Sequence, residues 1–370
     1  MKKNIKRIFI ISLMIIPVVL VSFLGIIIRR KINTTKNSFN FLNNQSDKVI
    51  LFIGDGMGEN HLKVASSYLN KDLFINSFKD QGYVTTYSNS IFSPTDSAAA
   101  ATSLATGKKV NNKEVSRHHN KNLLTISEYV KSLNKGVGII TTDSLSGATP
   151  ACFSSHAQNR NDEDDIISNQ AISNIDLFLG AGKASYDKYK NTFIEKGYTY
   201  IESYANLNVS SNKIIASFEK ISNYTSYDLA PTLENLVEFA INYMEFNYPN
   251  GYFLMIEGAH IDKESHKNNI YSMIEYLDEF DNSIKLASSM ISNVDNCSII
   301  VTADHETGNL KYTGTEKIDN SLYTRKSHSS KNVKYFINFK LKDNISYSLP
   351  NKIDNTDIYK ICKALLTNNN

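Results

Sequence analysis

One serine in this 370-residue chain stands between an acidic residue and a run of strong helix formers. Asp96 and Ser97 come directly before four alanines at positions 98–101. Because alanine has the highest helix propensity and Ser and Asp favour helix caps, we expect Ser97 at a helix N-terminus. The free N–H groups and the helix dipole there favour an anion, such as a phosphate or a serine alkoxide. The same pattern also fits an ordinary capped helix, so it does not by itself identify a nucleophile.

Four apolar runs are each followed by residue types that bind metals or phosphate. Short apolar runs separated by helical stretches predict buried parallel strands, and ligands bind beyond the carboxyl ends of such strands. We therefore expect an α/β fold with a mostly parallel central sheet and a site at one sheet edge. The runs and the polar residues after them are Val49–Gly54 with Asp55, Gly136–Ile140 with Thr149, His156 and Arg160, Tyr252–Ile256 with Glu257, Asp262 and His266, and Ser298–Ala303 with Asp304 and His305.

The residue types after these runs suit divalent metals. Zinc accepts carboxylate oxygens and imidazole nitrogens, whereas magnesium prefers sites made only of oxygen. Asp262 and His266 stand four residues apart and share one face if their segment is helical. Taken alone, this pair also fits an exposed helical pair, and Asp304 with His305 also fits a capped turn. Their occurrence together favours a two-metal site of the kind that stabilises the attacking and leaving oxygens in phosphoryl transfer.

The order of these motifs resembles that of the alkaline phosphatases, through most of residues 48–342. The resemblance implies a three-layer α/β/α sandwich with the site at the carboxyl ends of the strands. It rests on Ile53–Gly58, Thr95–Ala99, Ala148–Ala151 with His156 and Arg160, Glu257–Asp262, Thr302–His305, and His328 with Ser329.

The resemblance also implies a role for each site residue. Ser97 would be the nucleophile that becomes transiently phosphorylated, and Arg160 would bind two phosphate oxygens through its planar fork of donors. Metal coordination is one of the few ways to activate a serine hydroxyl, so no histidine base is required. The implied cofactors are two zinc ions and one magnesium ion, held by Asp262, His266 and His328 (first zinc), by Asp55, Asp304 and His305 (second zinc), and by Thr149 and Glu257 with Asp55 bridging (magnesium).

Two positions near the implied magnesium site bear on its affinity. Gly147 stands where the best-known bacterial pattern has an acidic residue, so it has no side chain to contact the ion or to accept hydrogen bonds from its waters. Losses of this kind commonly cost 10–100-fold in affinity, and we expect weak magnesium binding. Lys263 matches the bacterial form and is expected to approach phosphate through water, although it also fits an ordinary exposed lysine. We expect His260 at the rim of the site, and His61, His118 and His119 at the surface.

The N-terminus predicts a location. Ile8 to Ile28 form a 21-residue run without charge, flanked by basic residues on both sides. At 1.5 Å per residue the run spans roughly 31 Å, enough to cross a bilayer as one transmembrane helix. It lacks a small-residue cleavage site, so we expect an uncleaved signal anchor rather than a cleaved signal peptide. We expect a single-pass protein of the cell membrane with an extracellular catalytic domain, because a cytosolic zinc phosphatase would attack metabolic phosphates. The expected organisation is an anchor at 1–31, a flexible linker at 32–47, and a catalytic domain at 48–370 with a variable insertion at 183–228.

Charge and composition limit the partners. Residues 1–46 hold eight Lys or Arg and no acid, so the formal charge of +3 for the chain becomes −5 for residues 47–370. The excess of positive charge therefore lies in the N-terminal segment and not in the catalytic domain. For this reason we expect no nucleic-acid partner. Three widely spaced cysteines do not form a disulfide framework. Only 22 residues separate His305 from His328, and this short interval predicts an open site. A homodimer is possible, but the sequence does not support one.

These features favour a metal-dependent hydrolase of phosphate monoesters with a phosphoserine intermediate at Ser97, serving extracellular phosphate scavenging. One alternative is a phosphodiesterase or nucleotide pyrophosphatase of the same superfamily. Arg160 argues against it, because this side chain would cover oxygens that a diester esterifies. The other alternative is a non-catalytic surface protein that only binds phosphate, which the competent residue at every ligand position disfavours.

Overall fold

The computed structural model describes residues 37–223 and 230–367. The predicted membrane segment at 8–28 lies outside the described residues, and within 37–223 and 230–367 no helix is long and apolar enough to cross a membrane. The chain separates into two compact units, residues 1–38 and residues 39–370. The second unit holds all the predicted site residues.

A ten-stranded sheet runs through the unit. Among the described strands of this sheet only β13 is antiparallel to its neighbours, so the predicted mostly parallel sheet is confirmed. In their order across the sheet the strands are β14 (Lys352–Asp354), β2 (Asp80–Thr85), β13 (Val333–Asn338), β10 (Cys297–Thr302), β1 (Lys48–Gly54), β9 (Tyr252–Gly258), β5 (Gly136–Ser144), β6 (Leu177–Ala181), β8 (Lys213–Phe218) and β7 (Tyr198–Ile201).

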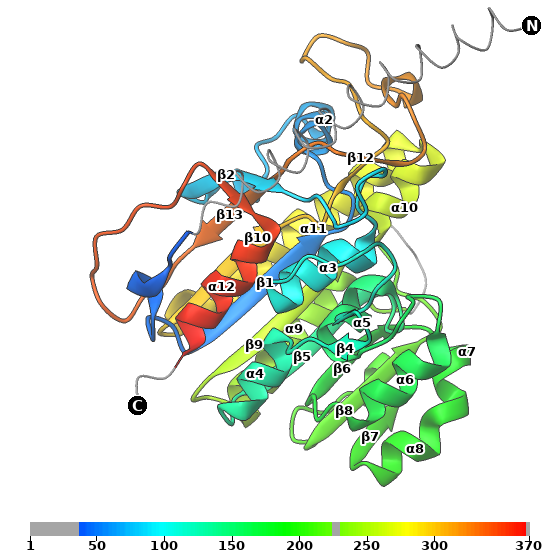
Figure 1. Ribbon diagram of the computed structural model, residues 1–370, viewed down its shortest axis with the longest axis vertical. Coiled ribbons are helices and arrows are strands. Elements are labelled where there is room, and N and C mark those ends of the chain that lie inside the picture. Colours follow the sequence, from blue (N-terminus) through cyan, green and yellow to red (C-terminus); the bar gives the residue numbers. More distant parts are fainter. Residues whose placement is uncertain (1–36, 224–229, 368–370) are drawn as a thin grey trace, which may run out of the picture. The chain divides into compact units, whose positions relative to one another are not determined.

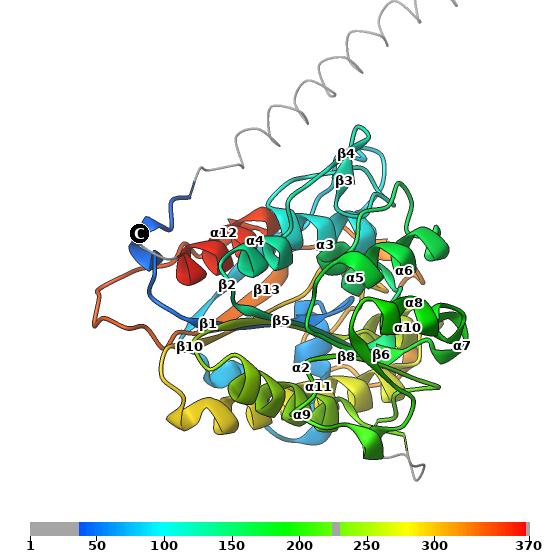
Figure 2. The same cartoon turned by 90° about the horizontal axis from the view of Figure 1, so that it is seen from below.

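Helices cover both faces of the sheet and produce the expected three layers (Figure 2). Because both faces are covered, the central strands are mostly apolar, and every residue of β1 and β9 is buried. One face carries α3 (Ser97–Thr106), α4 (Ile126–Ser132), α5 (Ala148–Ser154), α6 (Glu163–Ile172) and α12 (Asn355–Leu366); the other carries α2 (Glu59–Leu69), α9 (Leu233–Asn247) and α11 (Ile270–Met290).

The remaining elements are short. The helix α10 (His260–Lys267) follows β9 at the carboxyl end of the sheet. Two-stranded ribbons join β3 (Arg117–His118) to β4 (Lys121–Asn122), and β11 (Glu306–Thr307) to β12 (His328–Ser329). The other helices are α7 (Lys183–Tyr186), α8 (Lys190–Glu195), and the 3₁₀ turns η1 (Asn40–Leu42), η2 (Phe74–Ser77), η3 (Asp187–Tyr189), η4 (Tyr204–Asn206), η5 (Ile291–Asn293) and η6 (Asn320–Leu322).

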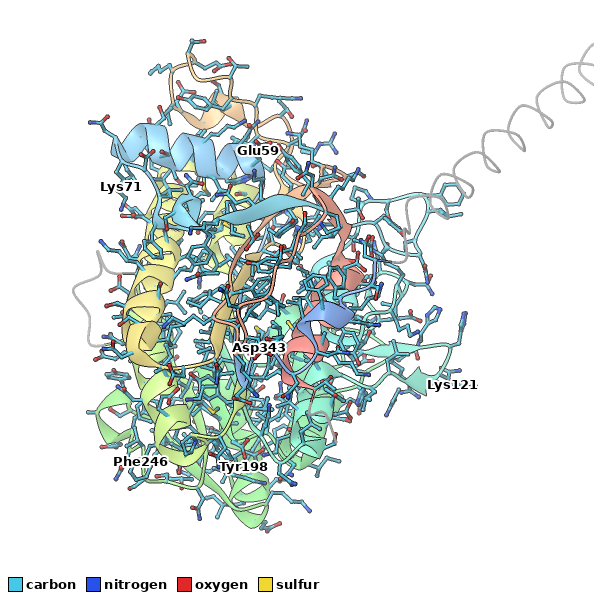
Figure 3. The ribbon with its side chains drawn as sticks, turned by 90° about the vertical axis from the view of Figure 1, so that its left-hand side faces the viewer. Glu59, Lys71, Lys121, Tyr198, Phe246 and Asp343 are labelled. Atoms are coloured by element: carbon cyan, nitrogen blue, oxygen red, sulfur yellow. The ribbon has the colours of Figure 1, made fainter. Side chains whose placement is uncertain are left out.

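Two segments bear on the expected organisation. The segment 183–228, expected to be a variable insertion with short elements, contributes the short strands β7 and β8, which extend the central sheet beyond β6. Figure 3 shows Tyr198 of β7 and Glu59 of α2 at opposite ends of this unit. Residues 39–47, assigned to the linker, pack on the body instead, because the side chains of Phe39 and Leu42 are buried in the core. Polar composition in these segments concealed the few apolar side chains that anchor them.

The helix α3 is fixed at its C-terminal end by a glycine. Gly107 ends the helix with φ +68°, and its N–H donates to the Ser103 carbonyl. A Cβ on Gly107 would lie 2.6 Å from a ring carbon of Tyr359 on α12. The absence of a side chain therefore lets α12 pack closely on the helix that carries Ser97.

Gly107→Ala is expected to lower the free energy of unfolding by about 2–4 kcal/mol, because left-handed strain adds to overpacking against Tyr359. Gly197→Ala is the matched control, since Gly197 has φ +86° but nothing lies within 4 Å of its Cβ position. This control should lose about 1 kcal/mol from strain alone. Urea unfolding of both variants measures the difference, and equal losses would contradict close packing of α12 at Gly107.

Candidate active site

The predicted site residues meet at the carboxyl edge of the sheet. Ile53 of β1 pairs with Thr302 of β10 on one side and with Glu257 of β9 on the other. The residues just beyond this row, including Asp55 and Asp304, therefore leave the sheet at the same level. Figure 1 shows α10 and β12 beyond the arrowhead end of β1, where they complete the site. The expected placement at the strand ends is confirmed.

Ser97 is the first residue of α3, as the alanine run predicts. The cap is Asp96, whose Oδ1 accepts a hydrogen bond of 2.9 Å from the Ala99 N–H. The Ser97 side chain is buried, and its Oγ lies 3.1 Å from Nε2 of His305. The serine hydroxyl therefore points at a predicted metal ligand from the positive end of a ten-residue helix.

Asp55, Asp304 and His305 form one group of potential metal ligands. Nε2 of His305 lies 3.2 Å from Oδ2 of Asp304 and 3.5 Å from Oδ1 of Asp55. Oδ1 of Asp304 accepts hydrogen bonds from the N–H groups of Gly56 and His305. In contrast, Oδ2 of Asp304 and Oδ1 of Asp55 are buried without a hydrogen-bond partner in the described structure. These two carboxylate oxygens therefore face the His305 imidazole without a hydrogen-bond donor to stabilise their negative charge.

The charges at this group are unbalanced. Burial, together with the neighbouring carboxylates of Asp304, Asp262 and Glu257, raises the pKa of Asp55 well above its usual range. Burial and then the charge of Asp262 raise the pKa of Asp304 to about 8. Buried carboxylates are stable as anions only when paired or bound to a metal. The group therefore fits a divalent cation.

A second group contains Asp262, His266 and His328. Asp262 and His266 lie on α10, so the predicted helical spacing is confirmed. Nε2 of His266 lies 3.3 Å from Oδ2 of Asp262 and 3.1 Å from Nε2 of His328. Two ring nitrogens this close, beside a carboxylate, form a natural position for a cation such as zinc.

Backbone carbonyls orient both histidines of this group. Nδ1 of His266 donates to the Lys326 carbonyl, and Nδ1 of His328 donates to the Thr95 carbonyl at 2.9 Å. A carbonyl oxygen can only accept, so Nδ1 carries the proton and the Nε2 lone pair of the neutral ring faces the group. The 308–327 loop and the segment before Ser97 therefore aim the two rings.

The two groups adjoin through His305. Its ring stacks on that of His328 with centroids 3.6 Å apart, and Asp262, His305 and His328 also satisfy the geometry of a metal site. The resemblance assigns His305 only to the group of Asp55 and Asp304, whereas the structure places its ring against both groups. Two metals bound here would be neighbours, as the two-metal arrangement requires.

A third set of oxygens lies beside Asp55. Oγ1 of Thr149, in the first turn of α5, is buried without a hydrogen-bond partner in the described structure. Glu257 is buried at the end of β9 and accepts a hydrogen bond from Thr141. Burial raises the pKa of Glu257 to about 7. With Asp55, these residues offer only oxygen, the donor set that magnesium prefers.

The two predicted phosphate-binding cations lie at the rim. Nη1 of Arg160 is 3.7 Å from Oδ2 of Asp96, and the Arg160 side chain is one-third exposed. The backbone N–H of Arg160 donates to the Lys113 carbonyl at 2.8 Å, which fixes the residue near the start of α3. Nζ of Lys263 forms an ion pair with Asp143. The Lys263 side chain is 42% exposed, so this residue lies at the rim of the site with its charge paired.

Sequence reasoning missed several polar residues that support the ligands. Oγ1 of Thr307 donates to Asp262 and lies 3.3 Å from Nδ1 of His305. Thr141 and Asp143, near the end of β5, contact Glu257 and Lys263 respectively. The only available signal was the position of these residues just beyond apolar runs, which many loop residues share.

The expectations for the other histidines are confirmed only in part. His260 lies near the rim, where its ring stacks on Tyr276 at 4.6 Å. His118 is half-buried beside Glu114, and His119 is exposed. The prediction for His61 is wrong, because its ring is buried between α2 and α10. Its Nδ1 accepts from the Gly58 N–H, Nε2 lies 3.1 Å from Oγ of Ser265, and burial lowers its pKa to about 3.

Comparison with known proteins agrees with this geometry. The family model described as "Alkaline phosphatase" matches residues 46–360. The chain belongs to the alkaline phosphatase family. Among curated members, alkaline phosphatase 4 of Bacillus subtilis is 29% identical over 283 residues, covering 70% of this chain and 61% of that protein. The alkaline phosphatase of Schizosaccharomyces pombe is 30% identical over 307 residues, covering 71% of this chain and 56% of that protein. The chain thus spans about three fifths of the length of these curated relatives.

Solved structures of family members share the fold. The alkaline phosphatase of the Antarctic bacterium TAB5 has a TM-score of 0.73 at 23% identity, covering 87% of this chain and 98% of that chain. The Thermus thermophilus enzyme has a TM-score of 0.75 at 16% identity, covering 88% and 92%. One structure of a TAB5 variant is described with Mg bound in its M3 site. The alkaline-phosphatase-like fold with its large, mostly parallel sheet is therefore confirmed.

The raised pKa of Asp304 predicts how metal-free protein responds to pH. The folded state holds a proton on Asp304 up to about pH 8, whereas the unfolded chain releases it near pH 4. The contribution of Asp304 to stability therefore falls as pH rises from 5 to 8. Metal-free Asp304→Asn should gain stability relative to the metal-free parent over this range. Histidines titrate in both proteins, so the comparison reports on Asp304 together with its neighbour Asp55, whose pKa the Asp304 charge raises.

Chelator-treated samples are compared by urea unfolding at pH 5 and pH 8. The control is Asp72→Asn, which changes an exposed aspartate. Adding zinc should reverse the order at pH 8, because the parent binds the metal through Asp304 and gains stability by binding. If the stability difference between Asp304→Asn and the parent changes with neither pH nor zinc, repulsion between buried carboxylates is not its cause.

Proposed function

We propose that the protein hydrolyses phosphate monoesters through a phosphoserine intermediate at Ser97. The observation that carries this proposal is the buried Ser97 Oγ, 3.1 Å from His305 at the start of α3, beside two groups of metal-ligand type. Membership of the alkaline phosphatase family supports a phosphatase activity.

Three metal ions fit the donor atoms of the site. The residues that would hold them are Asp262, His266 and His328 for one zinc, Asp55, Asp304 and His305 for the second zinc, and Asp55, Thr149 and Glu257 for magnesium. Bound zinc would favour the alkoxide of a nearby serine and stabilise charge on the attacking and leaving oxygens. The buried, unpartnered oxygens of Asp55, Asp304 and Thr149 support this assignment.

The residues of the chain then divide the reaction between them. Arg160 binds two unesterified phosphate oxygens through its paired N–H groups and turns the phosphorus toward Ser97. Ser97 Oγ forms a bond to phosphorus as the bond to the ester oxygen breaks, and the departing alcohol takes up a proton equivalent to the one that Ser97 lost. Water then attacks the phosphoserine, inorganic phosphate leaves, and Ser97 regains its proton. The backbone N–H groups at the start of α3 favour the anion throughout.

The proposed location is the outer face of the cell membrane, with the segment at 8–28 as anchor, and the proposed role is phosphate scavenging. The uncharged run at 8–28 motivates this proposal. Protease treatment of intact cells should release an active catalytic domain from the surface. Protection of the domain in intact cells, or expression unaffected by phosphate starvation, would contradict the location or the role.

Ser97→Ala is expected to reduce monoester turnover by at least about 1,000-fold, because no other group replaces the attacking oxygen. Ser103→Ala is the matched control, since Ser103 is buried on the same helix but donates only to the Ala99 carbonyl. Turnover of a chromogenic monoester by residues 39–370, supplied with zinc and magnesium, measures both. The control should keep most of its activity.

Three further measurements separate the alternatives. Acid quenching during turnover should trap phosphate on the peptide that contains Ser97, and mass spectrometry identifies it. Comparison of monoesters with diesters tests the alternative of a diesterase, which predicts faster diester hydrolysis. Binding of phosphate without turnover in fully metal-loaded protein would indicate a non-catalytic phosphate-binding protein and would contradict the proposal.

A further inference from the structure

The turn before α5 explains why position 147 is a glycine. The Gly147 N–H donates to the Ser144 carbonyl at 2.8 Å, which closes a tight turn between β5 and α5. A Cβ on residue 147 would lie 2.9 Å from that same carbonyl oxygen. The φ of Gly147 is −54°, so the backbone conformation itself is ordinary and the obstacle is space. No acidic side chain fits at 147 unless the turn moves.

A carboxylate from a different position occupies the adjacent space. Oδ2 of Asp143 lies 3.4 Å from the place where a Cβ of residue 147 would be. Asp143 is near the end of β5, and its N–H donates to Oγ1 of Thr141 at 3.0 Å. Thr141 in turn donates to Glu257, one of the oxygens expected to hold magnesium. Asp143 is therefore joined to the third metal site through a single threonine.

The two oxygens of Asp143 have different surroundings. Oδ1 forms the ion pair with Nζ of Lys263, the residue after Asp262. Oδ2, in contrast, has no hydrogen bond within residues 37–223 and 230–367. Asp143 and Lys263 both lie close enough to Glu257 to act on its charge, with opposite signs. One carboxylate thus fixes Lys263 at the rim and presents a free acceptor next to position 147, close enough to Glu257 to act on its charge.

We propose that Asp143 is the positioning residue of the magnesium site and takes the place of the acidic side chain that Gly147 cannot provide. Magnesium usually keeps several of its waters, and these need outer acceptors such as a carboxylate. Asp143 supplies that acceptor through Oδ2 and holds Lys263 toward the phosphate side through Oδ1. The inference rests on the proposed metal-dependent function. It reverses the expectation from sequence that Gly147 leaves magnesium weakly bound.

The test is calorimetric titration of magnesium into zinc-loaded protein, with zinc content measured separately by mass spectrometry. Asp143→Asn keeps the size of the side chain but removes its charge, and it should weaken magnesium binding about 10–100-fold while the zinc content stays unchanged. Asp143→Glu restores a carboxylate and should recover part of the loss. Lys263→Ala removes the ion-pair partner but keeps the acceptor, so it should weaken magnesium binding less than Asp143→Asn does.

Asp47→Asn is the matched control. Asp47 has a similar exposed fraction, 28% against 31% for Asp143, and also pairs with a lysine, Lys342. It precedes β1 and so lies at the opposite end of that strand from Asp55. Its substitution should leave magnesium affinity unchanged.

The outcomes separate this inference from the proposed function. Magnesium affinity of Asp143→Asn within twofold of the parent would overturn the inference, as would equal losses in Asp143→Asn and Asp47→Asn. Loss of zinc together with magnesium in Asp143→Asn would indicate a general structural role and would also overturn it. A parent protein that binds magnesium but hydrolyses no monoester would instead contradict the proposed function.

Discussion

Four carboxylates share one edge of the sheet, and their mutual repulsion is the constraint around which the site is built. Asp55 and Asp304 follow the adjacent strands β1 and β10, Glu257 lies at the end of the neighbouring β9, and Asp262 joins them from α10. Strands in register leave these side chains no room to separate, and burial removes the water that would screen them. A proton relieves this repulsion in metal-free protein, and a divalent cation relieves it with the carboxylates ionised, so the rigid sheet that creates the repulsion also favours metal binding.

The neighbouring histidines and the Ser97 hydroxyl are oriented toward these carboxylates by other parts of the fold. Carbonyls of Thr95 and Lys326 orient His328 and His266, so that lone pairs rather than N–H groups face the carboxylates. Ser97 comes from α3 on one face of the sheet, and the far end of this helix is held against α12 at Gly107. The nucleophile comes from a helical layer, whereas Asp55, Asp304 and His305 come from the ends of the strands. The packing of these layers sets the distance between them.

The strands and the main ligands could be predicted from sequence because their signals are local. An apolar run buried on both faces predicts a strand, and a polar residue directly after it must lie at the sheet edge. Interactions between distant segments left no such signal. The pair of Asp143 with Lys263 forms only when β5 and α10 meet, and the buried ring of His61 lies against Ser265 of α10 and Tyr323. The polar segment 183–228 concealed two strands, since a few inward-facing side chains such as Ile214 and Tyr198 suffice at the edge of a sheet.

We propose that the two groups of carboxylates and histidines each hold a zinc ion beside Ser97. Crystals of zinc-loaded protein, measured on both sides of the zinc absorption edge, can locate these ions. We expect two anomalous peaks, one among Asp55, Asp304 and His305 and the other among Asp262, His266 and His328. Fully zinc-loaded crystals with no peak at either group, or with zinc only at the protein surface, would contradict it.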